Sequence, residues 1–334
     1  NLSIEPERRA ELLKTKLIGI VKSAGYDATE IETEHNNSDS VLFTKDHCWV
    51  LAEDENSQSV LGKGIFLLTR NPELELCVVF EDIEAAGIAA RQAIGLKGET
   101  KIMYFQEGKL AQVSPALFPD TPITPTLSEE FEAMCRKAGV SIVCENGIWR
   151  GEILGLEVVR VDEGGIQVGV GRFDREAGEL LNSGESRVEH LIAAANQVRI
   201  QRTAAAGAHP LATLSRERWL RHKLLSEPEI IGLSEMTPID SVHESKNLKD
   251  FFPAAAIGID EDHKQVLCVC SVGIDIGLIP LTAELASLHK PGRIVIVLPP
   301  QDMLPLIIEA SHLLTTPSAL IGVDGEWACP TRSR

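Results

Sequence analysis

The densest group of polar side chains with chemical potential lies in the segment GVGRFDRE, residues 169–176. The segment joins a strand-like apolar run to a helix-like stretch, and the free N–H groups at such a helix start attract anions. We interpret Arg172 and Arg175 as groups able to hold a phosphate or a carboxylate. Asp174 or Glu176 would then serve as acid or base. The alternative is structural, with Asp174 as the helix cap and the other charges paired along the first turn.

A basic stretch from residue 199 to residue 224 is the second candidate. It contains six basic residues against one acid, namely Arg199, Arg202, Arg216, Arg218, Arg221 and Lys223 against Glu217. On a helix, Arg218 and Arg221 share a face that could meet a phosphate group or a nucleic-acid backbone. We therefore add His209, Arg216, Arg218 and Arg221 to the anion-binding candidates. The alternative is that the stretch offsets the acidic remainder of the chain through pairing within or between subunits.

The overall composition limits the partners of this chain. The chain has 334 residues, and its 49 acidic and 32 basic residues give a net charge of −17, which disfavours binding to nucleic acid except through residues 199–223. Hydrophobic residues make up 44% and aromatic residues 4%, as in a soluble globular protein whose core is built from Leu, Ile, Val and Ala.

Processing signals and cysteine usage indicate a compartment. The opening NLSIEPERRAELL has charges from residue 5 onward and no apolar core of a signal peptide. No apolar run approaches the roughly 18 residues that cross a bilayer. The seven cysteines are an odd number, and several lie in apolar runs, as is typical of reduced thiols. We therefore expect a cytoplasmic protein that does not bind a membrane.

Familiar cofactor, metal and nucleophile motifs are missing. Gly169-x-Gly171 is followed three positions later by Asp174 rather than by glycine, so it is no dinucleotide fingerprint, and neither a P-loop nor a Gly-x-Ser-x-Gly elbow occurs. Cys268 and Cys270 share one face of a strand, but no second pair of Cys or His follows at metal-ligand spacing. We interpret both as core residues. The sequence predicts no cofactor and no metal site, and it leaves the catalytic residues, if any, unknown.

Two similar patterns, 216 residues apart, indicate an internal duplication. Residues 41–52 and 257–268 both have a strand-turn-strand pattern with Asp-His at the turn. Apolar runs at 76–80 and 294–298 follow, and each leads into a helix pattern and another strand. A partial third copy covers residues 126–208. We predict an α/β fold, with α+β as the alternative, made of tandem related units of helix, antiparallel strands, helix and strand.

A proline-rich segment divides the predicted units. The segment SPALFPDTPITPTLS contains four prolines and resists both helix and sheet. We expect a first α/β unit, a linker, a middle partial unit, and a third unit related to the first, at residues 1–114, 115–125, 126–208 and 209–330.

Two resemblances bear on this organisation. The order of elements in each unit is similar to that of a restriction-endonuclease-like core, whose chemistry needs an acid on one strand and Glu-x-Lys on the next. No unit has that set, since the middle one offers Glu157 but no carboxylate on the following strand. The segments GVGRFDREA (169–177) and HPLATLSRERWLR (209–221) resemble a group of actinobacterial proteins of unknown function. That resemblance implies a bacterial cytosolic protein and no particular activity.

Two hypotheses of function follow. The first is a non-catalytic cytosolic binding or scaffold protein of degenerate α/β repeats that holds an anionic partner such as a small molecule, in a chain compatible with homo-oligomers. The second is a hydrolase or transferase for a small phosphorylated or carboxylated substrate, with Asp174 or Glu176 as base and Arg172 as clamp. An enzyme should gather Arg172 and Asp174 with His209 and Arg218 in one pocket, whereas a scaffold would spread them. We favour the first hypothesis.

Overall fold

The computed structural model describes most of the chain, namely residues 6–31, 40–52, 57–171, 175, 184–203, 209–243 and 252–328. Within these residues the chain has an α/β fold with three sheets. The chain divides into two compact units, each assembled from separate segments. The first unit consists of Asn1–Phe118, Ile276–Lys290 and Leu304–Ser318, and the second of Pro119–Asp275, Pro291–Met303 and Ala319–Arg334.

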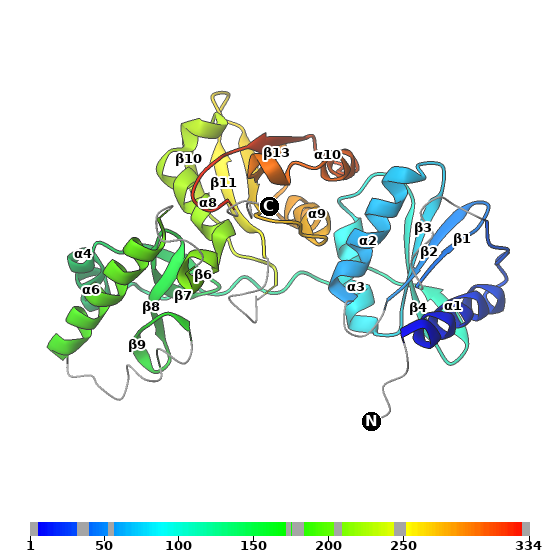
Figure 1. Ribbon diagram of the computed structural model, residues 1–334, viewed down its shortest axis with the longest axis horizontal. Coiled ribbons are helices and arrows are strands. Elements are labelled where there is room, and N and C mark those ends of the chain that lie inside the picture. The colour runs from blue at the N-terminus through cyan, green and yellow to red at the C-terminus, as the bar shows by residue number, and fades with distance from the viewer. Residues whose placement is uncertain are drawn as a thin grey trace. The chain divides into compact units, whose positions relative to one another are not determined.

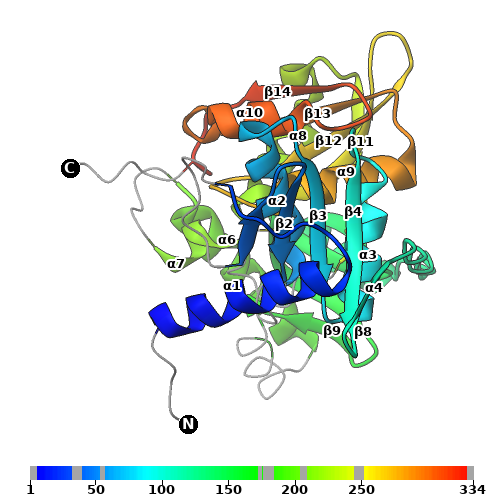
Figure 2. The ribbon, with the colours of Figure 1, turned by 90° about the vertical axis from the view of Figure 1, so that its right-hand side faces the viewer.

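Sheet one belongs to the first unit. Its strands follow chain order and are β1 (Val41–Phe43), β2 (His47–Leu51), β3 (Glu75–Phe80), β4 (Thr100–Gln106) and β5 (Lys109–Gln112). The strands β2, β3 and β4 are parallel, and the outer pairs are antiparallel. Helices α2 (Ser57–Arg70) and α3 (Ile83–Ala93) connect the parallel strands, and α1 (Pro6–Ser23) crosses the opposite face of the sheet (Figures 1 and 2). The core under α1 contains Leu17, Trp49 and Val79.

Two later helices complete the first unit. They are α9 (Leu278–His289) and α10 (Pro305–Ser311), where α9 packs on α2 and α3 and α10 packs on α2. Arg91 of α3 and Glu284 of α9 form an ion pair at 2.7 Å, and their side chains are 5% and 0% exposed. Gly95 permits the close approach, since a Cβ there would lie 2.4 Å from the carbonyl oxygen of Ala283.

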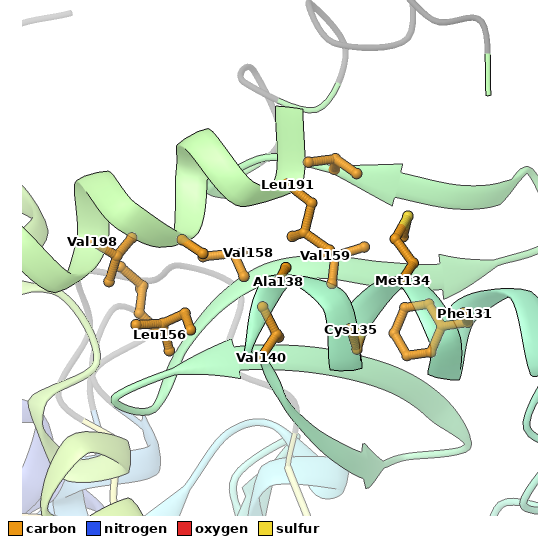
Figure 3. Packing of buried hydrophobic residues seen from close by; sticks show 13 residues of the cluster. Phe131, Met134, Cys135, Ala138, Val140, Leu156, Val158, Val159, Leu191 and Val198 are labelled. Atoms are coloured by element: carbon orange, nitrogen blue, oxygen red, sulfur yellow. The ribbon is translucent and has the colours of Figure 1, made fainter. Parts of the chain in front are cut away.

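Sheet two lies in the second unit and is antiparallel throughout. Its strands, in chain order, are β6 (Ser141–Glu145), β7 (Ile148–Ile153), β8 (Leu156–Asp162) and β9 (Gly165–Val168). Helices α4 (Glu129–Ala138) and α6 (Gly184–Gln201) pack on it through a core that includes Phe131, Val159 and Leu191 (Figure 3). Gly139 ends α4 with a φ of 64°, a left-handed conformation that glycine adopts readily at the end of a helix.

Sheet three belongs to the second unit apart from Ser318. Its strands are β10 (Glu235–Pro238), β11 (Ala254–Ile259), β12 (Gln265–Cys270), β13 (Arg293–Leu298) and β14 (Ser318–Gly322). β11 pairs with both β10 and β12 in antiparallel orientation, and β12 pairs with β13 in parallel. The short helix α7 (Pro210–Thr213) leads into α8 (Arg216–Ser226), which packs on the sheet through Trp219, Leu220 and Leu224. Pro238 is tolerated because β10 is an edge strand.

The first and third predicted repeats, residues 1–114 and 209–330, share the element order that the sequence predicts. The helix, antiparallel strands, helix, strand, helix and strand of α1 to β4 recur from α8 to β14. The proposed equivalence of the two Asp-His turns is wrong in detail. His47 is the first residue of β2 and lies opposite Glu75, whereas His263 stands in the turn before β12 with a φ of 59°. The two histidines are therefore not equivalent positions.

The middle predicted repeat, residues 126–208, has a different sheet topology. Its described strands form only antiparallel pairs, so it is at most a partial copy of the repeat. Residues 113–128 contain neither helix nor strand, as expected for the proline-rich segment. The division of the chain at 1–114, 126–208 and 209–330 stays a prediction. Across the described residues, none of the helices is both long and apolar enough to cross a membrane.

Candidate anion-binding site

A ladder of charged side chains runs across two strands of sheet two. Arg150 on β7 lies opposite Arg160 on β8, and Glu152 lies opposite Glu157. A shift in register between Gly151 and Glu152 separates the two rungs. Like charges directly opposite each other on neighbouring strands are destabilising. The ladder therefore depends on ion pairs of opposite charge, both between its own arginines and glutamates and with side chains of other elements.

Three guanidinium groups surround the carboxylate of Glu157. Arg160 donates to it through Nε at 2.7 Å and Nη2 at 2.9 Å, and Arg175 donates through Nη1 at 2.8 Å. The Nε atom of Arg150 forms an ion pair with it at 3.1 Å. The exposed fraction of the side chains is 9% for Glu157, 13% for Arg150 and Arg175, and 24% for Arg160. We call these four residues the Glu157 cluster.

The Glu157 cluster carries more positive than negative charge. It contains three arginines and one carboxylate, and the charge of Asp162 close to Arg160 and Arg175 offsets part of the difference. Burial lowers the pKa of Arg175, and the neighbouring charges of Arg160 and Arg150 lower it further against the effect of Glu157. Like charges held together with limited access to water are costly. An anion bound at the cluster would relieve that cost.

A second group of charges connects sheet two to α8. Arg218 donates to Glu152 at 2.7 Å and also to Glu145. Arg221 forms an ion pair with Glu145 at 2.5 Å. We call Glu145, Glu152, Arg218 and Arg221 the Glu145 cluster. Arg150 donates to Glu145 at 3.2 Å and so links the two clusters.

The two carboxylates of the Glu145 cluster have opposite pKa shifts. Burial favours the neutral form of Glu145, but the charges of Arg221, Arg218 and Arg150 outweigh it and lower the pKa of Glu145 to about 2. Burial raises the pKa of Glu152, and the attraction of Arg218 does not cancel this effect. The negative charge of Glu145 adds to the rise in the pKa of Glu152. The cluster therefore holds one firmly ionised carboxylate beside one that resists ionisation.

Three of the anion-binding candidates enter these clusters, namely Arg175, Arg218 and Arg221. Two others have structural roles instead. His209 is the N-cap of α7, where its Nδ1 atom accepts a hydrogen bond from the N–H of Leu211 at 3.2 Å. Arg216 is buried and donates to the carbonyl oxygen of Trp327 at 3.3 Å. The remaining candidates Arg172, Asp174 and Glu176 lie outside the described residues.

Other members of the basic stretch are also engaged within the chain. Arg202 is fully buried and donates to the carbonyl oxygens of Leu154 at 2.6 Å and Leu211 at 3.0 Å. Its guanidinium carbon lies 4.8 Å from the ring centre of Trp219 on α8. Burial lowers the pKa of Arg202 to about 10. Lys223 forms an ion pair with Glu227 at 2.5 Å. Arg218, Arg221 and Lys223 thus pair with acids of the same chain, whereas Arg202 and Arg216 donate to backbone carbonyl oxygens.

Sequence reasoning missed the partners of these arginines. Glu145, Glu152, Arg150 and Arg160 were not among the candidates, and Glu157 was considered only as a metal ligand. A signal was available in the turn at Asn146-Gly147, which fixes the pairing of β6 with β7 and so aligns their charged positions. Nothing local in the sequence shows that α8 contacts this part of the sheet.

The described residues show neither a metal site nor an exposed pair of thiols at the positions that the sequence singles out. Within the part of the chain that the structure describes, no three His, Cys, Asp or Glu side chains gather as a metal site. The sulfur atoms of Cys268 and Cys270 lie 3.9 Å apart, and both residues are fully buried in the core of sheet three. The prediction that they are core residues is confirmed.

Comparison of the chain with models of protein families, with curated proteins and with solved structures finds no match in any of the three. The restriction-endonuclease-like order of elements therefore finds no support from a similar structure.

Proposed function

We propose that this protein is a binding protein that holds a small anion with at least two negative charges at the Glu157 cluster. The observation that carries the proposal is the convergence of three arginines on one carboxylate. A phosphate or dicarboxylate group would supply the missing negative charge. Guanidinium groups match the geometry of such oxyanions, because they donate two parallel hydrogen bonds.

Some N–H donors of the cluster have no partner among the residues that the structure describes, and these donors support the proposal. Arg160 uses Nε and Nη2 for Glu157, and its Nη1 has no partner within the described residues. Arg175 uses Nη1 for the same carboxylate, and its Nε and Nη2 likewise have no described partner. Both side chains are partly exposed to solvent.

Binding rather than catalysis fits the state of the carboxylates. Glu145, Glu152 and Glu157 are each paired with at least one arginine, so none is free to act as a general base. The alternative, a hydrolase or transferase, rests on Arg172, Asp174 and Glu176 and stays a prediction.

We also propose a cytoplasmic location and a bacterial origin for the protein. The described cysteines are all free thiols, and most of them are buried. Such usage is typical of a reducing compartment. The resemblance to actinobacterial proteins supports the bacterial origin.

Calorimetric titration with inorganic phosphate at pH 7.5 and fixed ionic strength tests the proposed site. We expect saturable binding to the unmodified protein. The Arg160→Gln substitution should weaken it about tenfold or more, since a hydrogen bond to a charged group contributes about 1.5–3 kcal/mol. Arg136→Gln is the matched control, because Arg136 is an exposed arginine of the same unit on α4. Absence of saturable binding, or an equal loss in the control, would refute the proposal.

A second variant gives the opposite sign. Glu157→Gln removes the carboxylate that competes with the ligand for the three arginines, and it should therefore tighten phosphate binding. Circular dichroism at the titration temperature verifies that the variant is folded. If the folded variant binds phosphate more weakly than the unmodified protein, Glu157 does not compete with the ligand and the proposed site is wrong.

A further inference from the structure

The first unit contains a cavity whose lining includes no residue of the Glu157 cluster or the Glu145 cluster. It has a volume of about 430 Å³ and is formed by the end of α2, the turn into β3, the loop between α3 and β4, and the end of α10. Leu68, Leu74 and Leu313 give it an apolar lining. Cavities of this size with an apolar lining and a few polar groups are the usual sites of small organic ligands.

The polar lining of the cavity is predominantly acidic. Four of its residues are glutamates, namely Glu73, Glu75, Glu99 and Glu309. The basic lining residue Lys97 forms no ion pair with them among the described residues, and its Nζ atom donates to the carbonyl oxygen of His312 at 2.9 Å.

The four glutamates differ in how far they are already paired. Glu75 forms an ion pair with Lys101 at 2.7 Å, and Glu99 lies 3.9 Å from the same ammonium group. The carboxylates of Glu73 and Glu309 have no hydrogen bond or ion pair within the described residues. Glu73 and Glu309 come from different elements, the turn after α2 and helix α10, and both line the same cavity. Two carboxylates without a partner among the described residues thus border a cavity whose lining also includes leucine side chains.

We propose that this cavity binds a small organic cation with an aliphatic body, of the class of primary alkylamines. The leucine side chains would contact the alkyl chain, and the ammonium group would lie between Glu73 and Glu309. An anion of the same shape would meet unpaired carboxylates and lose affinity. The proposal is independent of the anion site, since the two sites have opposite charge and belong to different compact units.

Hexylamine, hexanol and hexanoate are suitable probes, because they share one alkyl chain and differ in charge. The readout is the NMR shift of leucine methyl groups in the 334-residue chain, with Leu156 of the second unit as an internal reference. We expect hexylamine to shift the methyl signals of Leu68, Leu74 and Leu313 saturably and to leave Leu156 unchanged. Hexanol and hexanoate should bind at least several-fold more weakly. Unmoved signals at the three leucines, or equal binding of hexanoate, would overturn the proposal.

Two substitutions test the role assigned to the carboxylates. Glu73→Gln and Glu309→Gln should each weaken hexylamine binding about two- to fivefold, as expected for ion pairs that remain partly solvated. Glu11→Gln is the matched control, because Glu11 is an exposed glutamate on α1 of the same unit. The side chains of Glu73 and Glu309 are exposed, so the two variants should fold normally. Equal affinity in the two variants and the control would contradict the proposal.

Discussion

Replacement of Glu145 by glutamine should destabilise the second unit by about 3–5 kcal/mol, the usual effect of removing one partner of a buried ion pair. Arg218 would keep Glu152, and Arg150 would keep Glu157. Arg221 would keep only the carbonyl oxygen of Ala255, at 3.3 Å. Because the side chain of Arg221 is 3% exposed, its charge would stay buried without a counter-charge.

The expected change is large enough to measure by thermal unfolding. A loss of this size corresponds to a fall in melting temperature of about 6–20 °C for a unit of this length. Circular dichroism and tryptophan fluorescence can follow the transition, the latter through Trp219 on the helix that Glu145 holds. Glu130→Gln is the control, since Glu130 is 71% exposed and pairs with Arg187 at 3.6 Å. That surface pair should contribute less than about 1 kcal/mol.

A double variant separates the loss of the pair from the burial of a lone charge. Replacing both Glu145 and Arg221 by leucine should recover most of the stability lost in Glu145→Gln, because an apolar pair leaves no buried charge. If Glu145→Gln unfolds no earlier than the Glu130→Gln control, the reasoning about the Glu145 cluster is refuted.

Two other predictions concern packing and pH. Gly95→Ala should destabilise the first unit by about 1–3 kcal/mol in urea denaturation, since its Cβ would meet the backbone of Ala283. Gly19→Ala on α1 should instead stabilise the first unit by about 0.5–1 kcal/mol, because the added Cβ would meet no atom within 4 Å beyond its own stretch of helix. Burial raises the pKa of Glu217 to about 7 from 4.5, so native stability should fall as pH rises through that interval. Glu217→Gln should remove this fall of about 3 kcal/mol, and unchanged melting curves between pH 4.5 and 8 would contradict the assignment.

Local signals predicted much of the fold. The helix expected at the start of the third predicted unit is α8, which spans Arg216–Ser226. The helix expected after the apolar run at 294–298 is α10, which begins at Pro305, the helix position where proline is best tolerated. These elements are specified by caps, glycines and prolines that act over a few residues, so one sequence suffices to place them.

The candidate site could be predicted only in part. The sequence predicts Arg175 as an anion-binding group where a strand meets a helix, and it places Arg218 and Arg221 on one face of a helix. Their partners were not, because Arg218 and Glu145 are 73 residues apart and meet only through tertiary packing. The register shift between Gly151 and Glu152 also interrupts the alternation of side chains between the two faces of the sheet. The sequence alone therefore does not show which charged side chains of β7 and β8 share a face.

The most direct test of the anion site is an NMR titration of arginine side-chain N–H signals with inorganic phosphate. We predict that the Nε–H signals of Arg160 and Arg175 shift together and saturate with one dissociation constant. The signal of the exposed Arg136 should not shift in this way. If the signals of Arg160 and Arg175 do not move, or if they move no more than that of Arg136, the Glu157 cluster does not bind an anion.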